Sequence, residues 1–383
     1  MSARRAGSAP LIVLLCIAVA ELIAAGSLAV AARSAVHART VAAIVKARAG
    51  AEAAVRAAMA GWDMAALGGT PIGSIIPVAA GAGALPGGVT HTATVERLSS
   101  SRWLLRGEAL VQGTAGPAAR ARASAIVVTI PLDSLWLDFG ATLTSGGDVA
   151  LAPGAIVDGG AAALPPPPWT AAQCPAAAVN AMQGSLGAVA RPGVAMATGA
   201  TLSAGGASVT GNPPVVPAAA RADSAAHQRF GVLSRAETAL IADRLETGSI
   251  TPAPVLAGTV CDTTAPGNWG APLAPSHACA DYFPLIHASG DLSVTGGAGQ
   301  GLLVVAGDLT LAGTSFHGVI QVGGRLLANN STIHGALRTA GGTGTPAGLR
   351  ITHSACSLWR AFERSPELRR AYRPPGRWWL PPL

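Results

Sequence analysis

Two aspartates near the C-terminus could take part in acid–base chemistry. Asp291 and Asp308 hold equivalent positions 17 residues apart in a glycine-rich stretch, residues 288 to 338. Two carboxylates on one face could cleave a glycosidic bond. The third equivalent position is Arg325, however, and a polar corner of a repeated structure accounts for all three side chains. We interpret them as corner residues.

A second column of polar side chains, Gln300, His317 and His334, has the same spacing. Stacked imidazoles beside an amide could bind a ligand or a metal ion, but a metal site normally adds Asp, Glu or Cys. We interpret the column as an exposed or corner ladder. The sequence also lacks a nucleophile elbow, a phosphate-binding loop, a zinc-protease helix and a dinucleotide fingerprint. We therefore expect no catalytic residue, no cofactor and no metal ion.

The cysteines indicate disulfide chemistry. Cys261 and Cys279 enclose a loop rich in proline and glycine, DTTAPGNWGAPLAPSHA. Closing about 17 residues is worth roughly 3 kcal/mol in the chain-entropy model, so we predict this pair. A disulfide implies an oxidising, exported location. Cys16 lies in an apolar run, and the pairing of Cys174 and Cys356 stays open.

The elements that would position these residues follow a period of 17. Leu292, Leu309 and Leu326 recur at this interval, and so do two columns of glycine: Gly290, Gly307 and Gly324, and Gly301, Gly318 and Gly335. A unit this short and this rich in Gly and Val fits one coil of a β-solenoid, with the leucines stacked inward and the glycines at corners. Residues 145–160 and 197–212 look like imperfect coils of the same kind.

Three further segments complete the predicted part of the chain after the N-terminal helix and stalk, which we call the head. Residues 86–131 read as a small antiparallel sheet. Residues 234–247 predict a helix with a capping box, Ser234 and Glu237, ended by Gly248. After the last coil, Trp359 and Phe362 lie on a short helix that we expect to cap the open end of the solenoid. The basic and aromatic tail beyond it is expected to lie against a neighbour or the solenoid wall.

The N-terminus predicts a membrane anchor. Residues 10–32 are apolar over about the length that crosses a bilayer of roughly 30 Å, and Arg4 and Arg5 precede them. Glu21, the one charge inside, is expected to be paired or functional; the alternative is a neutral Glu bonded to Ser27 or the backbone. The Ala-rich residues 33–60 should continue the helix as a stalk. A cleaved signal peptide ending at Ala32 is the other interpretation.

Composition agrees with a packed chain. Of 383 residues, 50% are hydrophobic and only 12% charged, which argues against disorder. We predict a mainly β fold: a long N-terminal transmembrane and stalk α-helix, a small antiparallel β-sheet, then a Gly-rich β-solenoid with a C-terminal cap. The predicted segments are 1–64 (leader, membrane helix and stalk), 65–132 (antiparallel sheet), 133–225 (irregular solenoid), 226–287 (short helix and disulfide loop), 288–345 (regular solenoid) and 346–383 (cap and tail).

Both ends of the chain resemble a known family. A basic leader, the junction Gly7-Ser8, a long apolar helix and ARAGAEAAVRAAMAGW (47–62) resemble the N-terminal segment of PilX-type minor pilins, which help to assemble type IV pili. CDTTAPGNWGAP (261–272) and GQGLLVVAGDLTL (299–311) resemble the C-terminal region of PilX-like proteins. The resemblance implies a prepilin peptidase that cuts between Gly7 and Ser8, and a helix buried in the pilus core. The sequence departs from the family at the fifth mature position, where Ile12 replaces the usual Glu.

These patterns predict a non-enzymatic, single-pass inner-membrane component of a type IV pilus or a related assembly system, with its C-terminal part exported. The expected partners are membrane lipid, other pilin-like subunits and the assembly machinery. Much of the net charge of +7 comes from arginines beside the apolar run and in the C-terminal tail, so we expect no nucleic-acid partner. Two alternatives remain: an anchored β-helical surface protein that binds or cleaves polysaccharide, and a bactofilin-like scaffold in the cytoplasm. The predicted disulfide argues against the second.

Overall fold

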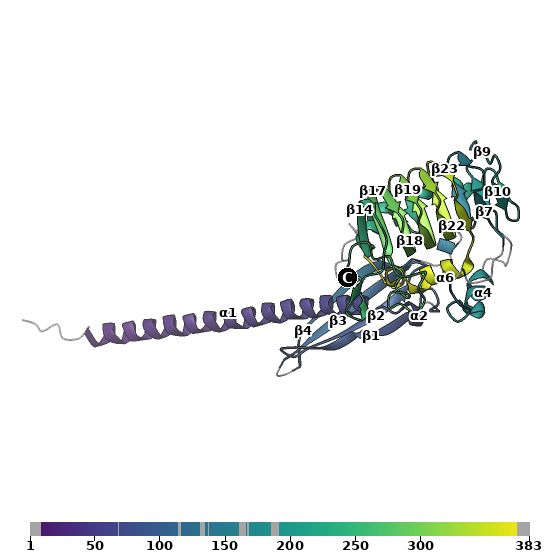
Figure 1. Ribbon diagram of the computed structural model, residues 1–383. Helices are drawn as coiled ribbons and strands as arrows, with labels where there is room; N and C mark the ends of the chain where they lie inside the picture. Colours follow the sequence, from purple (N-terminus) through teal and green to yellow (C-terminus); the bar gives the residue numbers. More distant parts are fainter. Residues whose placement is uncertain are drawn as a thin grey trace, which may run out of the picture.

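The chain folds as a long helix that leads into two β structures (Figure 1). The computed structural model describes residues 9–67, 69–113, 116–130, 135–136, 138–160, 166, 168–184 and 191–373. A four-stranded antiparallel sheet lies beside the C-terminal part of the helix, and a 16-stranded parallel sheet forms the far end of the molecule. The prediction of a mainly β fold with a long apolar N-terminal helix is confirmed.

The first element, α1 (Ala9–Ala60), is one helix of 52 residues. Its only proline, Pro10, stands in the first turn, where a missing N–H costs no hydrogen bond, and alanine dominates the rest. At a rise of 1.5 Å per residue the helix is about 78 Å long. It ends before Gly61, and the short helix α2 (Met64–Leu67) follows. The apolar run and the stalk are therefore continuous.

The antiparallel sheet packs on the last quarter of α1. Its strands follow one another in order: β1 (Ile75–Leu85), β2 (Val89–Arg97), β3 (Arg102–Gly113) and β4 (Gly116–Val128). A stripe of buried small residues on α1 faces them: Ala47, Ala51, Ala54, Val55 and Ala58. A methyl group at Gly107 of β3 would overlap the backbone oxygen of Ala51, so the sheet approaches the helix to backbone contact. Trp62 and Trp103 meet edge to face at 5.5 Å at the end of this interface.

The sequence patterns missed strand β1. Its residues, IIPVAAGAGAL, contain no alternation of large apolar and polar side chains, and Pro77 argues against a central strand. The structure makes β1 an edge strand, where proline is tolerated. Its small residues fit because the strand crosses α1 closely.

The parallel sheet is a solenoid whose coils contribute strands to three faces. The first face contains, in spatial order, β14 (Arg244–Ile250), β17 (Leu285–Thr295), β18 (Ala298–Val305), β20 (Ser315–Val322), β22 (Thr332–Thr339), β5 (Leu143–Ser145), β8 (Val194–Met196) and β11 (Val215–Val216). Strands β14 and β17 continue into the second face, which adds β19 (Leu309–Ala312), β21 (Leu326–Asn329), β23 (Thr343–Ala347), β6 (Val149–Leu151) and β9 (Leu202–Ser203). The third face contains the first halves of β18, β20 and β22, then β24 (Arg350–Thr352), β7 (Ile156–Asp158) and β10 (Ser208–Thr210).

The register of the coils is the predicted period of 17. Leu292 pairs with Leu309 and Leu309 with Leu326, and all three are buried in the interior. Gly318 marks the corner between the third and first faces, with φ of +139°. A methyl group there would overlap the carbonyl oxygen of Gly301 in the coil before it, so the corner requires glycine.

The order of the coils in space differs from their order in the sequence. The coils formed by β5–β7 and β8–β10 stack on the side of β22–β24, at the C-terminal end of the regular repeat. The chain then crosses back to β14 and builds the regular coils towards β5. Segments 143–158 and 285–352 thus share one interior, the cluster that contains Leu143, Val157, Leu309 and Ile351.

The predicted helix over 234–247 is too long. The capping box is present: the Ser234 hydroxyl accepts the N–H of Glu237, whose carboxylate accepts the N–H of Ser234. However, α5 spans Arg235–Ile241 only, and Arg244–Ile250 form strand β14 parallel to β17. Asp243 lies between them and accepts the N–H of Leu285 at 2.8 Å. Pairing with a ready-made strand edge outweighs the local helix pattern.

The C-terminal helix covers a side of the solenoid and not its open end. Helix α6 (Ala355–Arg364) packs against β18, β20 and β22, and α7 (Pro366–Arg369) follows it. The first face carries outward apolar side chains as well as inward ones: Leu285, Leu302, Val304, Val319 and Ala336. Phe362 is fully buried among them, whereas Trp359 is only partly buried. The predicted end cap was wrong because a solenoid face with apolar residues on both sides needs a second layer.

Short elements complete this second layer and the loops. The hairpin β12 (Arg229–Phe230) and β13 (Leu233–Ser234), the 3₁₀ turns η1 (Ala220–Ala222) and η2 (Ser224–Gln228), and α4 (Ala176–Gly184) lie beside the first face or its neighbours. A second hairpin, β15 (Leu256–Ala257) and β16 (Val260–Cys261), lies in the predicted disulfide loop.

Candidate functional site

The largest uncovered apolar surface of the described chain is the first part of α1. Leu11, Leu22 and Leu28 are 72–74% exposed, and the sheet covers the helix only from about Ala47 onwards. The helix is long and apolar enough to cross a membrane, by length and composition. Folding leaves this segment without a packing partner among the residues that the structure describes, so its burial needs a lipid bilayer or other helices.

The exposed surface continues past the apolar run. Val36, Val41 and Val45 are exposed, and Arg33 and Lys46 lie among them on the same bare stretch. A helix with both apolar and basic side chains exposed suits the boundary between lipid and water, or a bundle of equivalent helices. About 13 residues, or roughly 20 Å of helix, separate Arg33 from Lys46, where the head begins.

The structure describes the predicted intramembrane acid, Glu21, but not the predicted processing site. Gly7 and Ser8 lie outside the described residues. Glu21 is exposed on α1 and makes no ion pair within the described part of the chain. Ser27 donates its hydroxyl to the carbonyl of Ala24 at 2.9 Å and so does not bond Glu21. The carboxyl group thus points away from the fold, where a neighbouring helix could reach it.

The predicted ladder of Gln300, His317 and His334 is present in register, directly before the corner glycines, but two of its three members are buried, so the exposed form of the ladder was the wrong alternative. Gln300 and His317 are fully buried, and His334 is half-buried. Gln300 donates from Nε2 to the carbonyl oxygens of Ala280 (2.9 Å) and Tyr282 (2.8 Å). The amide thus holds the disulfide loop against the solenoid, which is a structural role.

His317 lies between an indole and a second imidazole. Its ring centre is 5.0 Å from that of Trp169 and 4.7 Å from that of His334. Burial, with smaller effects of His334 and Arg360, lowers the pKa of His317 to about 3. Burial also lowers the pKa of His334. Both rings are neutral near pH 7 and pack as aromatic groups.

An arginine is enclosed in the same layer. The Arg360 guanidinium lies 4.5 Å from the ring centre of Trp169 and 4.9 Å from that of Phe283, in cation–π geometry. Its Nη2 donates to Asp281 Oδ1 at 2.5 Å. These contacts fasten α6 to the disulfide loop. The Asp281 carboxylate is the ion-pair partner of Arg360 in this attachment.

Two disulfides join distant parts of the head. Cys261 pairs with Cys279 across the loop, with Cα atoms 4.8 Å apart. Cys174 pairs with Cys356 and ties the segment before α4 to α6, across 182 residues of sequence. Cys16 is free and exposed on α1. The sequence could not choose the second pair, because its members meet only through the inverted order of the coils.

The aspartates of the repeat form a ladder along one corner. Asp291 Oδ1 accepts the N–H of Asp308 at 2.8 Å, and Asp308 Oδ1 accepts the N–H of Arg325 at 2.7 Å. Asp148 Oδ1 does the same for Thr201 in the last coils. Each carboxylate caps the backbone of the next coil, which agrees with the interpretation as corner residues. Among the described residues, no group of three or more His, Cys, Asp or Glu side chains could hold a metal ion.

Two tryptophans organise the head, and the sequence patterns did not identify their roles. Trp269 occupies the third-face position of the first coil: its carbonyl accepts the N–H of Gln300 at 2.8 Å and its indole packs on Phe316 inside the solenoid. The Trp269 Nε1 donates to Glu246 at 3.1 Å. Trp169 donates to the carbonyl of Pro272 at 2.8 Å. A lone Trp in a loop full of glycine and proline is the signal that could have indicated such anchors.

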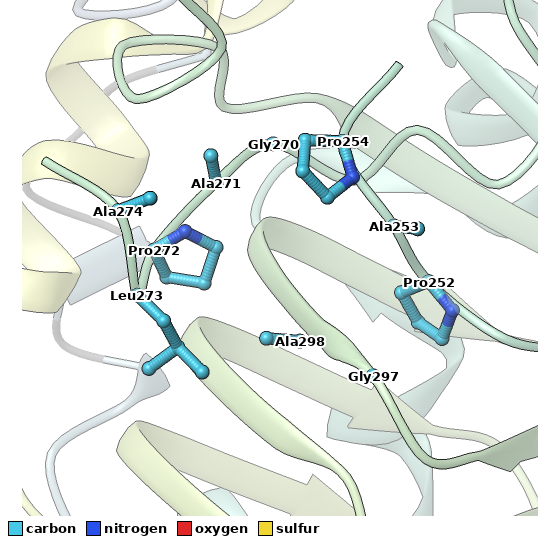
Figure 2. Close-up of a pocket in the computed structure, with 10 residues that line it drawn as sticks. All are labelled: Pro252, Ala253, Pro254, Gly270, Ala271, Pro272, Leu273, Ala274, Gly297 and Ala298. Carbon is cyan, nitrogen blue, oxygen red and sulfur yellow. The ribbon is translucent and has the colours of Figure 1, made fainter. Parts of the chain in front are cut away.

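An apolar cavity opens beside these anchors (Figure 2). It has a volume of about 450 Å³, and its lining residues are Pro252, Ala253, Pro254, Gly270, Ala271, Pro272, Leu273, Ala274, Gly297 and Ala298. None of these side chains carries a charge or a hydrogen-bonding group. The cavity can therefore exclude water from an apolar group but offers no acid, base or nucleophile.

Comparison with known proteins gives no further guide. No protein-family model, no curated protein and no solved structure matches the chain.

Proposed function

We propose that the chain is a non-enzymatic, membrane-anchored component of a type IV pilus or a related assembly system, similar to a minor pilin. One observation carries the proposal: α1 is a single helix in which residues 11–42 are all exposed while its last turns pack under an antiparallel sheet. A protein of this shape buries its helix in lipid before assembly and among other helices afterwards. The resemblance of residues 47–62 to PilX-type proteins supports the same function.

The head supports a structural role by its chemistry. The carboxylates of the repeat cap backbone N–H groups, and Gln300 and Arg360 fasten the loop and α6 to the solenoid. Three of the polar side chains that could have formed a polysaccharide site, Asp291, Asp308 and Gln300, are thus engaged in holding the fold. A rigid solenoid at the far end of a long helix would present a fixed surface to partners outside the membrane.

The topology that follows from the proposal is a single span with the head exported. The disulfides Cys174–Cys356 and Cys261–Cys279 favour an oxidising compartment for the head. The basic leader, Arg4 and Arg5, would then remain on the cytoplasmic side, where basic residues are enriched.

The test is the N-terminus of the protein taken from the membrane fraction of its native host. Intact-mass measurement and N-terminal sequencing should give a chain that begins at Ser8. A chain that begins at Met1 would indicate a plain anchor, and one that begins at Arg33 a cleaved signal peptide; both would contradict the proposal.

A second measurement tests assembly itself. Cys16 is a free cysteine on the uncovered part of α1, so a short cross-linker with a thiol-reactive group at one end and a photoreactive group at the other should join Cys16 to neighbouring helices in membranes. The matched control is Cys16→Ser, which should remove the cross-linked species. Absence of any cross-linked species for the wild-type chain, in cells that form the assembly, would argue against helix packing between subunits.

A further inference from the structure

The solenoid finishes in an uncovered coil at the end opposite β14 (Figure 1). Strands β9 and β10 each pair on one side only, and β11 pairs with β8 alone, so all three have a free edge. We call these three strands the open end. Their inward side chains are only partly buried, whereas the inward leucines of the regular coils are fully buried. The partly buried residues of this coil are Ala200, Leu202, Ala204, Ala207, Val209 and Val215.

One residue in each strand of the open end directs its backbone groups away from the solenoid. In a parallel ladder, alternate residues turn both their N–H and their C=O to the same side. The N–H of Val149 donates to the carbonyl of Thr201, so residues 201 and 203 bond β6, and Leu202 faces the free side. The registers of β10 and β11 place Val209 and Val215 in the same way. Each of these three residues offers one N–H and one C=O to a further strand.

The open end also lacks the charges that usually protect a strand edge. Residues 192–220 contain no Asp, Glu, Lys or Arg, although these residues make up 12% of the whole chain. A free edge normally carries a charge, because its unpaired backbone groups otherwise form a ladder with another chain. Apolar side chains, unpaired backbone groups and the absence of charge together make the open end suited to pair with a second set of strands.

The chain already stacks two separate groups of coils in this way. Leu143 of β5 pairs with Leu337 of β22, which lies 194 residues later (337 − 143), and β6 and β7 pair with β23 and β24. The edges of coils that are distant in sequence thus join into one ladder with one shared interior. Stacking of coils on this solenoid therefore does not require that they follow one another in the chain.

The two ends of the solenoid favour contact between identical ends. A copy stacked head to tail would meet the β14 end, whose interior is filled by Trp269 and whose loop is closed by a disulfide. The corner ladder also stops at the open end: Asp148 caps Thr201, which has no carboxylate to cap a further coil. Two open ends related by a two-fold axis instead bring their edges together antiparallel, and facing residues in such a pair can exchange both hydrogen bonds. An axis through the second face would pair β9 with the same strand of the second copy, and β10 with its β11.

We propose that two copies of the chain associate through their open ends, with Leu202, Val209 and Val215 of both copies enclosed between them. Because both copies use the same end, the contact closes as a dimer and does not extend into a fibre. Helix α1 leaves the head on the β14 side, so the two anchors lie on opposite sides of the contact (Figure 1). Such a dimer joins heads that approach from two facing surfaces. The inference does not depend on pilus assembly, because it concerns the head alone.

The test is the mass of the full chain in detergent, measured by light scattering after size-exclusion chromatography over a range of concentrations. The wild type should form a dimer that dissociates on dilution. Leu202→Lys should weaken dimerisation at least tenfold, because its ammonium group reaches water through the open end of a monomer but is enclosed in the dimer. Thr310→Lys adds the same charge at an exposed position of another coil and should leave dimerisation unchanged. A wild type that stays monomeric, or equal dimerisation of the two variants, would overturn the proposal. Association through α1 would give the second result, and cross-linking of Cys16 measures that association separately.

Photo-cross-linking gives a second result that does not depend on the folding of Leu202→Lys. Benzoylphenylalanine replaces Ser203, which is exposed on β9, and a mixture of ¹⁵N-labelled and unlabelled full chains in detergent is irradiated, digested and analysed by mass spectrometry. We expect peptides from residues 192–220 of two differently labelled chains to be joined. Cross-links confined to one isotope would show that the chain covers its own open end. Cross-links to detergent or to another face of a second copy would show a different occupant, and each of these results would contradict the proposal.

Discussion

The inward and outward positions of the second face allow a sharp test of the coil register. Leu309 is fully buried between Leu292 and Leu326 in the interior, whereas its neighbour Thr310 is exposed. Leu309→Asp should therefore unfold the solenoid, and Thr310→Asp should be tolerated. The two substitutions introduce the same charge one residue apart, so they differ only in the side of the sheet that receives it.

The expected magnitudes are far apart. Loss of a buried leucine costs about 2–3 kcal/mol of apolar burial, and an unpaired carboxylate in a dry interior adds roughly 3–5 kcal/mol. The sum of about 5–8 kcal/mol equals much of the total stability of an ordinary domain, about 5–15 kcal/mol. A surface substitution such as Thr310→Asp usually changes stability by less than about 0.5 kcal/mol.

The assay is urea unfolding of the full chain in detergent, followed by the fluorescence of the tryptophans buried in the head, such as Trp169 and Trp269. Leu309→Asp should show no cooperative transition, or a midpoint far below the wild type. Thr310→Asp should retain the wild-type midpoint and slope. Similar losses in both variants, or a larger loss for Thr310→Asp, would show that the register of the coils is wrong.

Three further predictions concern the corner, the buried imidazoles and the long disulfide. Gly318→Ala should destabilise the solenoid by at least about 2 kcal/mol in the same urea assay, because its methyl group meets the backbone of Gly301 at a positive φ, and Gly313→Ala, at a positive φ with open space around it, should cost less. Burial lowers the pKa of His317 and of His353 to about 3, so both side chains bind protons more weakly in the folded state than in the unfolded state. The free energy of unfolding should be full above about pH 6.5 and fall by about 2 kcal/mol per histidine by pH 5. If a variant with both histidines replaced by Gln unfolds with the same pH dependence as the wild type, this cause is refuted. Replacing Cys174 and Cys356 by serine should cost up to about 5 kcal/mol for a separation of 182 residues, against about 3 kcal/mol for Cys261 and Cys279, and the reverse order in unfolding midpoints would contradict the chain-entropy argument.

The regular part of the solenoid could be predicted because its information is local. One coil repeats at a fixed interval, so Leu309 and Gly318 each find an equivalent residue 17 positions away. The same holds for α1, where alanine and the absence of proline after Pro10 decide the structure by themselves. Each of these inferences needs only the residue and its neighbours in sequence.

The errors occurred where partners are distant in sequence. The pattern at 242–247 suits a helix, but β17 offers a strand edge that the pattern cannot reveal. His317 and Gln300 looked exposed because nothing in the repeat indicates that Trp169 and the disulfide loop cover the third face there. Trp359 and Phe362 were assigned to an end of the solenoid, although the apolar residues outside the first face provide the larger surface to cover.

The two ends of the solenoid are closed differently. The β14 end is filled by Trp269, whose loop is fastened by a disulfide and by Gln300. At the other end, Leu202, Val209 and Val215 of the last coil are only partly buried.

Because β5–β10 are made before β14 in the sequence yet stack on β22–β24, the last regular coil must find a surface that the chain formed about 190 residues earlier. Pairing over such separations carries a large loop-closure cost and is slow. The Cys174–Cys356 disulfide joins the two sides of this junction, since Cys174 lies between β7 and β8 and Cys356 lies at the start of α6, the next element after β24. Its position therefore supports a contact in the solenoid that the repeat itself does not encode.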